Sequence, residues 1–113
     1  MGTSNYEKLT DEQLIRNLRD GDKKIMDYIM EKYKNVVRKE AKAMYLIGGE
    51  NDDLIQEGMI GLFKAICDYR EERETSFFHF AELCISRQIY HAIEAAGRKK
   101  HVPLNAYVSL SGS

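Results

Sequence analysis

The sequence predicts an all-α protein, a compact bundle of about four helices. Apolar residues recur at spacings of three and four along most of the chain, which is the period of one helix face. Pro103 is the one proline, and most of the eight glycines fall between the helical patterns. No segment alternates apolar and polar residues in the manner of a half-buried strand, and no internal repeat is visible.

The first helix is predicted to begin after Thr10, because Thr10 and Gln13 form a capping-box signature. Gly21 is expected to end it. A long second helix is predicted from about Lys23 to Leu46, and Gly48 with Gly49 should stop it. The apolar positions that define these two helices are Leu14, Ile15, Leu18, Ile25, Met26, Ile29, Met30, Tyr33, Val37, Ala41 and Met44.

The third helix is predicted to begin at an N-cap of Asn51 or Asp52 and to close at Tyr69. The fourth should be capped by Thr75 or Ser76 and run to about Lys99, packing antiparallel to the second. Pro103 prevents further helix nearby. The apolar stripes of these helices are Ile55, Met59, Leu62, Phe63 and Ile66, then Phe77, Phe80, Leu83, Cys84, Ile85, Ile89, Ile93 and Ala96.

Composition narrows the class of protein. The chain has 113 residues and a formal net charge of −1, which fits one domain and excludes a uniformly basic nucleic-acid binder. Cys67 and Cys84 lie among apolar residues, which indicates buried thiols in a reducing compartment. The three histidines show no metal-ligand spacing. No signal peptide and no membrane-length apolar run is visible, so a cytoplasmic location is expected.

A first functional pattern lies on the third predicted helix. Asp53, Gln56 and Glu57 share one face, and Ile60 extends that face by a turn. Such a patch suits arginines of a partner protein, although on geometry alone ordinary helix solubility is the favoured explanation. Gly58 and Gly61 favour the first interpretation, because paired glycines inside a helix indicate close approach by a neighbouring element or a partner.

A second pattern is aromatic. The cluster contains Tyr69 and the run Phe77, Phe78, His79 and Phe80. Phe77 and Phe80 share a side of the helix and the other two rings of the run do not, so the four cannot all enter one core. Some aromatic surface near a basic helix should therefore stay accessible. Bases of single-stranded DNA stack on such rings while cations meet the phosphates. The alternative, that every phenylalanine is core, stays open.

A third pattern lies on the last helix, where polar residues share one face opposite its apolar stripe. Arginine there could read base edges or neutralise phosphates, and a merely solvated amphipathic helix is the alternative. The residues of this face are Arg87, Tyr90, His91, Glu94 and Arg98.

These patterns occur in the order seen in region 2 of the bacterial sigma-70 superfamily. The segments that carry the resemblance are DDLIQEGMIGLFKAICDY (52–69), TSFFHFAELCISRQIYHAI (75–93) and RKKHVPLN (98–105). The runs QEGMIGL and FAELCISRQI are similar to the sporulation and stationary-phase type, sigma-H. The resemblance implies a region 2 domain over residues 1–105, followed by a tail or linker over 106–113.

The resemblance also implies roles in transcription initiation. Asp53, Gln56, Glu57 and Ile60 would bind the β′ coiled coil of core RNA polymerase. Phe80, supported by Phe77 and Tyr69, would capture an unstacked adenine of the −10 promoter element on the non-template strand. The remaining residues expected to contact promoter DNA are Arg87, Tyr90, His91, Arg98, Lys99 and Lys100. No cofactor and no membrane is implied, and an inhibitory anti-sigma partner is left open.

The chain departs from the family pattern in two ways. Leu83 and Cys84 stand where housekeeping members carry a tryptophan pair, so the wedge that opens the duplex is expected to be weaker and promoter tolerance narrower. Nothing after Pro103 resembles the helix-turn-helix domain that binds the −35 element. The main rival is an all-helical protein-interaction module that never binds DNA. An enzyme that pairs Glu57 with a histidine lacks a supporting motif.

Overall fold

The computed structural model describes residues 6–48 and 51–99, with side chains described at 6–44 and 52–97. The helices are α2 (Asp11–Arg19), α3 (Lys24–Lys32), α4 (Lys34–Gly48), α5 (Asn51–Asp68) and α6 (Phe77–Lys99), with a short 3₁₀ helix, η1 (Glu71–Arg73), before α6. The predicted all-α class is therefore confirmed over the described part of the chain. In that part, no helix is both long and apolar enough to cross a bilayer.

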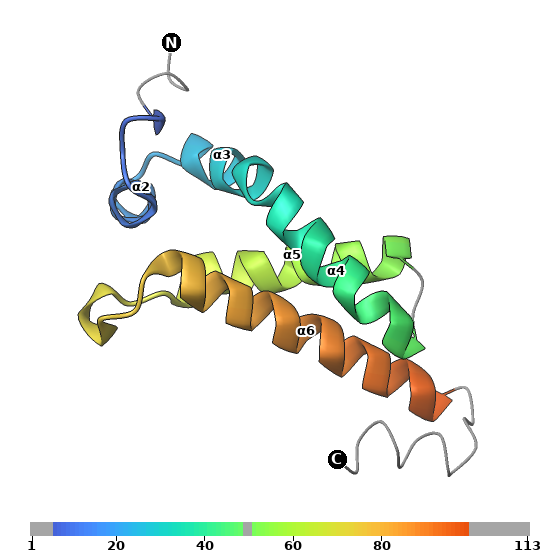
Figure 1. Cartoon of the computed structure of the whole chain (residues 1–113). Coiled ribbons are helices and arrows are strands. Elements are labelled where there is room, and N and C mark those ends of the chain that lie inside the picture. The colour runs from blue at the N-terminus through green and yellow to red at the C-terminus, as the bar shows by residue number, and fades with distance from the viewer. Residues whose placement is uncertain (1–5, 49–50, 100–113) are drawn as a thin grey trace.

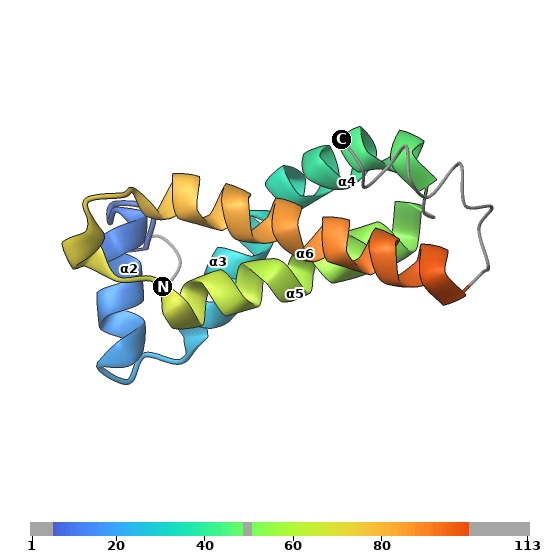
Figure 2. The ribbon, with the colours of Figure 1, turned by 90° about the horizontal axis from the view of Figure 1, so that it is seen from below.

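Three helices form the body of the molecule. Figure 1 shows α4, α5 and α6 lying side by side along its length. Figure 2, from below, shows α5 and α6 as an antiparallel pair, with α2 crossing the end where α5 stops and α6 begins. The core between them contains Leu14, Ile15, Ile25, Ile29, Tyr33, Val37, Ala41, Leu54, Leu62, Ala65, Ile66, Tyr69, Phe77, Ala81, Ile85, Ile89 and Ile93.

The predicted antiparallel packing of the second and fourth helices is wrong. Tyr33 lies against Phe77 near the start of both segments, and Ser86 donates to Glu40 (2.8 Å) further along both. α4 and α6 therefore run in the same direction. α5 returns the chain between them, so it is α5 that is antiparallel to each (Figure 1).

The predicted long second helix is in fact two helices that meet at Tyr33. This residue leaves helical geometry with φ −93° and ψ 4°. No glycine or proline marks the break. Instead, Tyr33 is held by tertiary contacts, because its ring packs edge-on against Phe77 and its hydroxyl donates to Asp11 on α2.

The start of α2 is confirmed as predicted. The Thr10 hydroxyl accepts from the Gln13 amide (3.1 Å), and the Gln13 side chain accepts from the Thr10 amide (2.8 Å). Gly21, just after the helix, has φ +124°, a conformation that other residues rarely adopt.

The buried face of α5 differs from the predicted stripe. Leu54, Leu62 and Ala65 are buried with Ile66, whereas Phe63 is 47% exposed. The two glycines explain this orientation. A Cβ on Gly58 would meet Val37 Cγ1 at 2.6 Å, and one on Gly61 would meet the Cys84 carbonyl oxygen at 2.8 Å. The predicted close approach at these glycines is therefore confirmed for neighbouring elements, α4 and α6, and the glycines give no support to a partner. Because this face of α5 is turned inward, Phe63 lies on the outside.

Two further burial predictions were wrong. Leu83 is 48% exposed on α6, and the Cys67 thiol is exposed near the end of α5. Both residues follow the apolar period of their helices, but each points away from the α5–α6 contact. Cys84 is partly buried, and both cysteines are free thiols.

Candidate functional site

One exposed stripe runs along α5. Asp53, Gln56, Ile60 and Phe63 follow one another at spacings of three and four, so they lie on one face of the helix. Ile60 is 44% exposed and Phe63 is 47% exposed. Large apolar side chains left in solvent beside hydrogen-bonding groups are typical of a protein-docking surface.

Glu57 was predicted to share this stripe but lies at its edge. Its side chain is partly buried, and its carboxylate accepts a hydrogen bond from Gln88 of α6 (2.9 Å). Gln88 in turn accepts from Lys64 (3.1 Å). Glu57 therefore joins α5 to α6 while remaining next to the exposed face, a position that helical spacing alone does not reveal.

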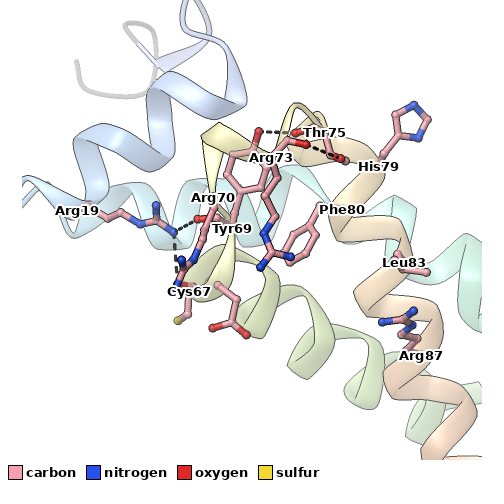
Figure 3. A pocket seen from close by; sticks show the side chains of 11 residues that line it. Arg19, Cys67, Tyr69, Arg70, Arg73, Thr75, His79, Phe80, Leu83 and Arg87 are labelled. Atoms are coloured by element: carbon pink, nitrogen blue, oxygen red, sulfur yellow. Dashed lines mark hydrogen bonds between the residues drawn. The ribbon is translucent and has the colours of Figure 1, made fainter.

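A groove opens where α5 ends and α6 begins, and its volume is about 970 Å³ (Figure 3). It brings together side chains from α2, the end of α5, η1 and the first half of α6. The residues that line it are Arg19, Cys67, Asp68, Tyr69, Arg70, Arg73, Thr75, His79, Phe80, Leu83 and Arg87.

Phe80 is the accessible ring among the three predicted for DNA capture. It is partly buried, lines the groove and lies 5.8 Å from the ring of Tyr69. Phe77 is 0% exposed and Tyr69 is 3% exposed. Both rings therefore belong to the core, where they pack edge-on at 5.5 Å. Tyr69 packs against Phe80 and Phe77 packs against Tyr69, but neither of these buried rings presents a face for stacking.

Tyr69 is fixed from both sides of the loop. Its hydroxyl donates to the Thr75 carbonyl (2.6 Å), and its own carbonyl accepts from Arg19 (2.7 Å). Burial raises the pKa of its phenol, with Glu12 and Glu71 adding to the effect. The ring therefore stays neutral at ordinary pH and packs against Phe80 from a fixed position.

The groove is rich in cations, and sequence reasoning missed Arg70 and Arg73 among them. Arg70 and Arg73 are exposed and line it together with Arg87. Within the described residues, none of the three forms an ion pair. The sequence showed only a charged loop at 70–74, and the reversal of the chain between α5 and α6 is what brings that loop beside Phe80.

The predicted polar face of α6 is only partly assembled. Arg87 and His91 are exposed one turn apart, whereas Tyr90 is partly buried with its ring 6.3 Å from that of His91. His91 lies 3.7 Å from Glu94, a pair that is ionic only when the imidazole is protonated. The side chains of Arg98 and Lys99, and the whole of Lys100, lie outside the described residues.

Comparison with known proteins supplies the family. Residues 29–99 match the model of Sigma-70 region 2. The RNA polymerase sigma-H factor of Bacillus licheniformis is 54% identical over 103 residues, which are 91% of this chain and 46% of that protein. The sigma-H factor of Bacillus subtilis is 52% identical over 103 residues, covering 91% and 47%. The sigma-F factor of Bacillus licheniformis is 32% identical over 88 residues, covering 78% and 34%.

The chain thus spans less than half the length of these relatives. No solved structure matches it. The family match covers α4, α5 and α6 in full, with most of the groove and the whole exposed stripe of α5. The chain therefore belongs to the sigma-70 region 2 family, and sigma-H factors are among its relatives.

Proposed function

We propose that this chain is the part of a cytoplasmic RNA polymerase sigma factor that binds core polymerase and captures the −10 promoter element during strand opening. It would act by binding rather than by catalysis. The observation that carries the proposal is the groove, in which the accessible ring of Phe80 lies among Arg70, Arg73 and Arg87. Asp68 also lines it, but none of these arginines forms an ion pair with any residue that the structure describes. The relatives named as sigma factors support the same activity.

Single-stranded DNA fits the chemistry of this groove. An unpaired base can stack on Phe80, and each such stack contributes about 1–3 kcal/mol. Arg70, Arg73 and Arg87 can neutralise the flanking phosphates. Leu83 is exposed beside them, and an aliphatic side chain offers less stacking surface than a tryptophan. We therefore expect weaker support for strand opening and narrower promoter tolerance.

The exposed stripe of α5 would bind polymerase. Asp53 and Gln56 offer oxygen acceptors to arginines of the β′ coiled coil, and Ile60 supplies an apolar centre that is 44% exposed. Glu57 would contribute from the edge of the stripe, where its bond to Gln88 holds the carboxylate in place. The stripe continues by one turn from Phe63 to Cys67, which lines the groove. The two partners would therefore bind adjacent surfaces.

The polymerase interaction is tested by titrating the chain with a β′ coiled-coil fragment. Asp53→Ala, Gln56→Ala and Glu57→Ala should each weaken saturable binding while circular dichroism shows unchanged helicity. Lys39→Ala is the matched control, because Lys39 is exposed on α4. No binding by the folded wild-type chain would contradict the polymerase role.

The DNA interaction is tested with the chain bound to core polymerase, because a net charge of −1 makes binding by the free chain weak and salt-sensitive. Phe80→Ala should abolish capture of a single-stranded −10 oligonucleotide and leave polymerase binding intact. Phe78→Ala is the control, since Phe78 is 43% exposed but does not line the groove. Polymerase binding without Phe80-dependent capture would favour a protein-interaction module.

A further inference from the structure

One face of α2 makes hydrogen bonds to three separate segments that surround the groove. Glu12, Arg16 and Arg19 lie at i, i+4 and i+7, so they share a face of this helix. Their partners lie at the start of α6, in η1 and at the end of α5. These are the segments that present Phe80, Arg73 and Tyr69.

Glu12 caps α6 from a distance in sequence. Its carboxylate accepts the Phe77 amide at 2.7 Å, across 65 residues. The Ser76 hydroxyl accepts another first-turn amide, that of His79, at 3.2 Å. The first turn of a helix has unpaired amides and a partial positive charge, so a carboxylate there both satisfies a donor and is stabilised. That turn is the one that carries Phe80.

Arg19 holds the end of α5. Its Nη2 donates to three carbonyl oxygens, those of Ile66 (3.2 Å), Cys67 (3.3 Å) and Tyr69 (2.7 Å). The last carbonyls of a helix have no partner within it, so a basic side chain there fixes the final turn. Arg16 adds a bidentate contact to Glu71 of η1, at 2.8 and 3.0 Å.

The apolar anchoring of α2 is separate from these polar contacts. Leu14 and Ile15 are 0% and 1% exposed and pack into the common core. Because this apolar contact does not involve the three polar residues, we expect α2 to stay packed when they are substituted one at a time. The polar contacts can therefore be removed individually without removing the helix.

We infer that Glu12 and Arg19 are positioning residues for single-strand capture. By holding the start of α6 and the end of α5, they let α2 set the distance between the rings of Phe80 and Tyr69. The inference rests on the proposed function, because it assigns the groove to DNA. The helix α2 lies outside residues 29–99, which match the family model. The inference therefore makes promoter capture depend on an element that the family match does not include.

The first test needs no DNA. Amide hydrogen exchange is measured in the full chain for Glu12→Ala and Arg19→Ala, with Asn17→Ala as control because Asn17 is exposed on α2. The amides of residues 69–80 should exchange faster in the first two variants, with the Phe77 amide most affected by Glu12→Ala. Those of residues 85–93 should not change. Unchanged exchange at 69–80, or uniformly faster exchange throughout the chain, overturns the inference.

Glu12→Gln guards against a general loss of folding. Its amide oxygen can still accept the Phe77 amide without the charge, so exchange at residues 69–80 should return toward the wild-type rate. Failure of this conservative variant to restore protection, with its melting temperature equal to that of the wild type, overturns the capping role.

The second test measures capture of a single-stranded −10 oligonucleotide by the chain bound to core polymerase. Glu12→Ala and Arg19→Ala should each lower affinity by roughly five- to tenfold, since part of one base stack is lost. Binding of the β′ fragment should not change. Arg19→Lys keeps the charge, but its side chain is one bond shorter than the reach to Nη2, the nitrogen that makes all three contacts. It should therefore bind about as weakly as Arg19→Ala.

The remaining outcomes separate the two proposals. Restored affinity in Arg19→Lys, with a salt slope that Arg19→Ala lowers by about one, would make Arg19 a direct phosphate contact and overturn its positioning role. Absence of capture by the wild-type chain would contradict the proposed function. The exchange measurement would still decide whether α2 positions the groove wall.

Discussion

Gly61 of α5 lies directly against the backbone of Cys84 on α6, because a Cβ at Gly61 would stand 2.8 Å from the Cys84 carbonyl oxygen. It would also stand 3.0 Å from the Cα of Ile85. Backbone atoms cannot move aside, so Gly61→Ala must separate the two helices. We expect destabilisation of about 1–3 kcal/mol, despite the better helix propensity of alanine. Urea denaturation measures this loss.

Gly58→Ala is the matched comparison on the same helix. A Cβ there would meet side-chain ends, Val37 Cγ1 at 2.6 Å and Ile89 Cδ1 at 3.2 Å. Ile89 Cδ1 is the end of a longer side chain and can shift, whereas the buried, β-branched Val37 can give way only at some cost. Alanine gains about 1 kcal/mol in helix propensity, which offsets part of that cost. Gly58→Ala should therefore lose less stability than Gly61→Ala. An equal or reversed order would show that the α5–α6 backbone contact is not the limiting one.

The three phenylalanines at the start of α6 should differ sharply in their effect on stability. Phe77 is 0% exposed between Tyr33 and Tyr69, so Phe77→Ala should cost about 3–5 kcal/mol. Phe80 is only partly buried and should cost less. Phe78 is 43% exposed and should cost least. Chemical denaturation of the three alanine variants gives this order.

This order also tests the assignment of Phe80 to the groove. A loss for Phe80→Ala as large as that for Phe77→Ala would place its ring in the core, and any loss of DNA capture would then follow from unfolding. A folded Phe80→Ala variant with impaired capture would separate the two roles.

Much of the helical framework was predictable because its signals are local. The capping box at Thr10 and the end of α2 just before Gly21 depend on neighbouring residues, and both appear as expected. The break at Tyr33 carries no local signal. It depends on contacts with Asp11 and Phe77, which become neighbours only through the tertiary fold.

The exposed site residues on α5 could be predicted because their exposure follows the period of the helix. The site residues in the loop at 70–74 could not, because their position depends on the tertiary fold. Asp53, Gln56 and Ile60 share an exposed face as their spacing implied. Arg70 and Arg73 were missed because nothing in a charged loop indicates which helix it will face. The rotation of Phe63 out of the core follows from the glycine contacts, which period alone does not contain.

The two thiols should react at different rates. Cys67 is exposed, whereas Cys84 is partly buried, and burial raises the pKa of the Cys84 thiol, with Asp68 adding to the effect and Arg87 opposing it. The thiolate is the reactive form. A disulfide reagent at about pH 8 should therefore modify Cys67 in a fast phase and Cys84 in a slow one. Cys67→Ser should remove the fast phase, and denaturant should merge the two.

The ion pair between α2 and η1 should be visible as a pH effect. The hydrogen bond from Arg16 is the main cause that lowers the pKa of Glu71 below the ordinary glutamate value, and the charges of Arg16 and Arg19 add to it. A carboxyl with a lower pKa in the folded state stabilises the fold above its unfolded pKa. That stabilisation is lost as the pH falls through the folded value.

Both side chains are exposed, so the effect on the free energy of unfolding is small and screened by salt. The sharper measurement is an NMR titration of the Glu71 carboxyl. Arg16→Ala should move its midpoint upward toward the ordinary value, and Asn17→Ala, on the same helix, should not. An unchanged midpoint in Arg16→Ala would mean that α2 does not hold η1 in solution. The groove wall would then depend on Glu12 and Arg19 alone.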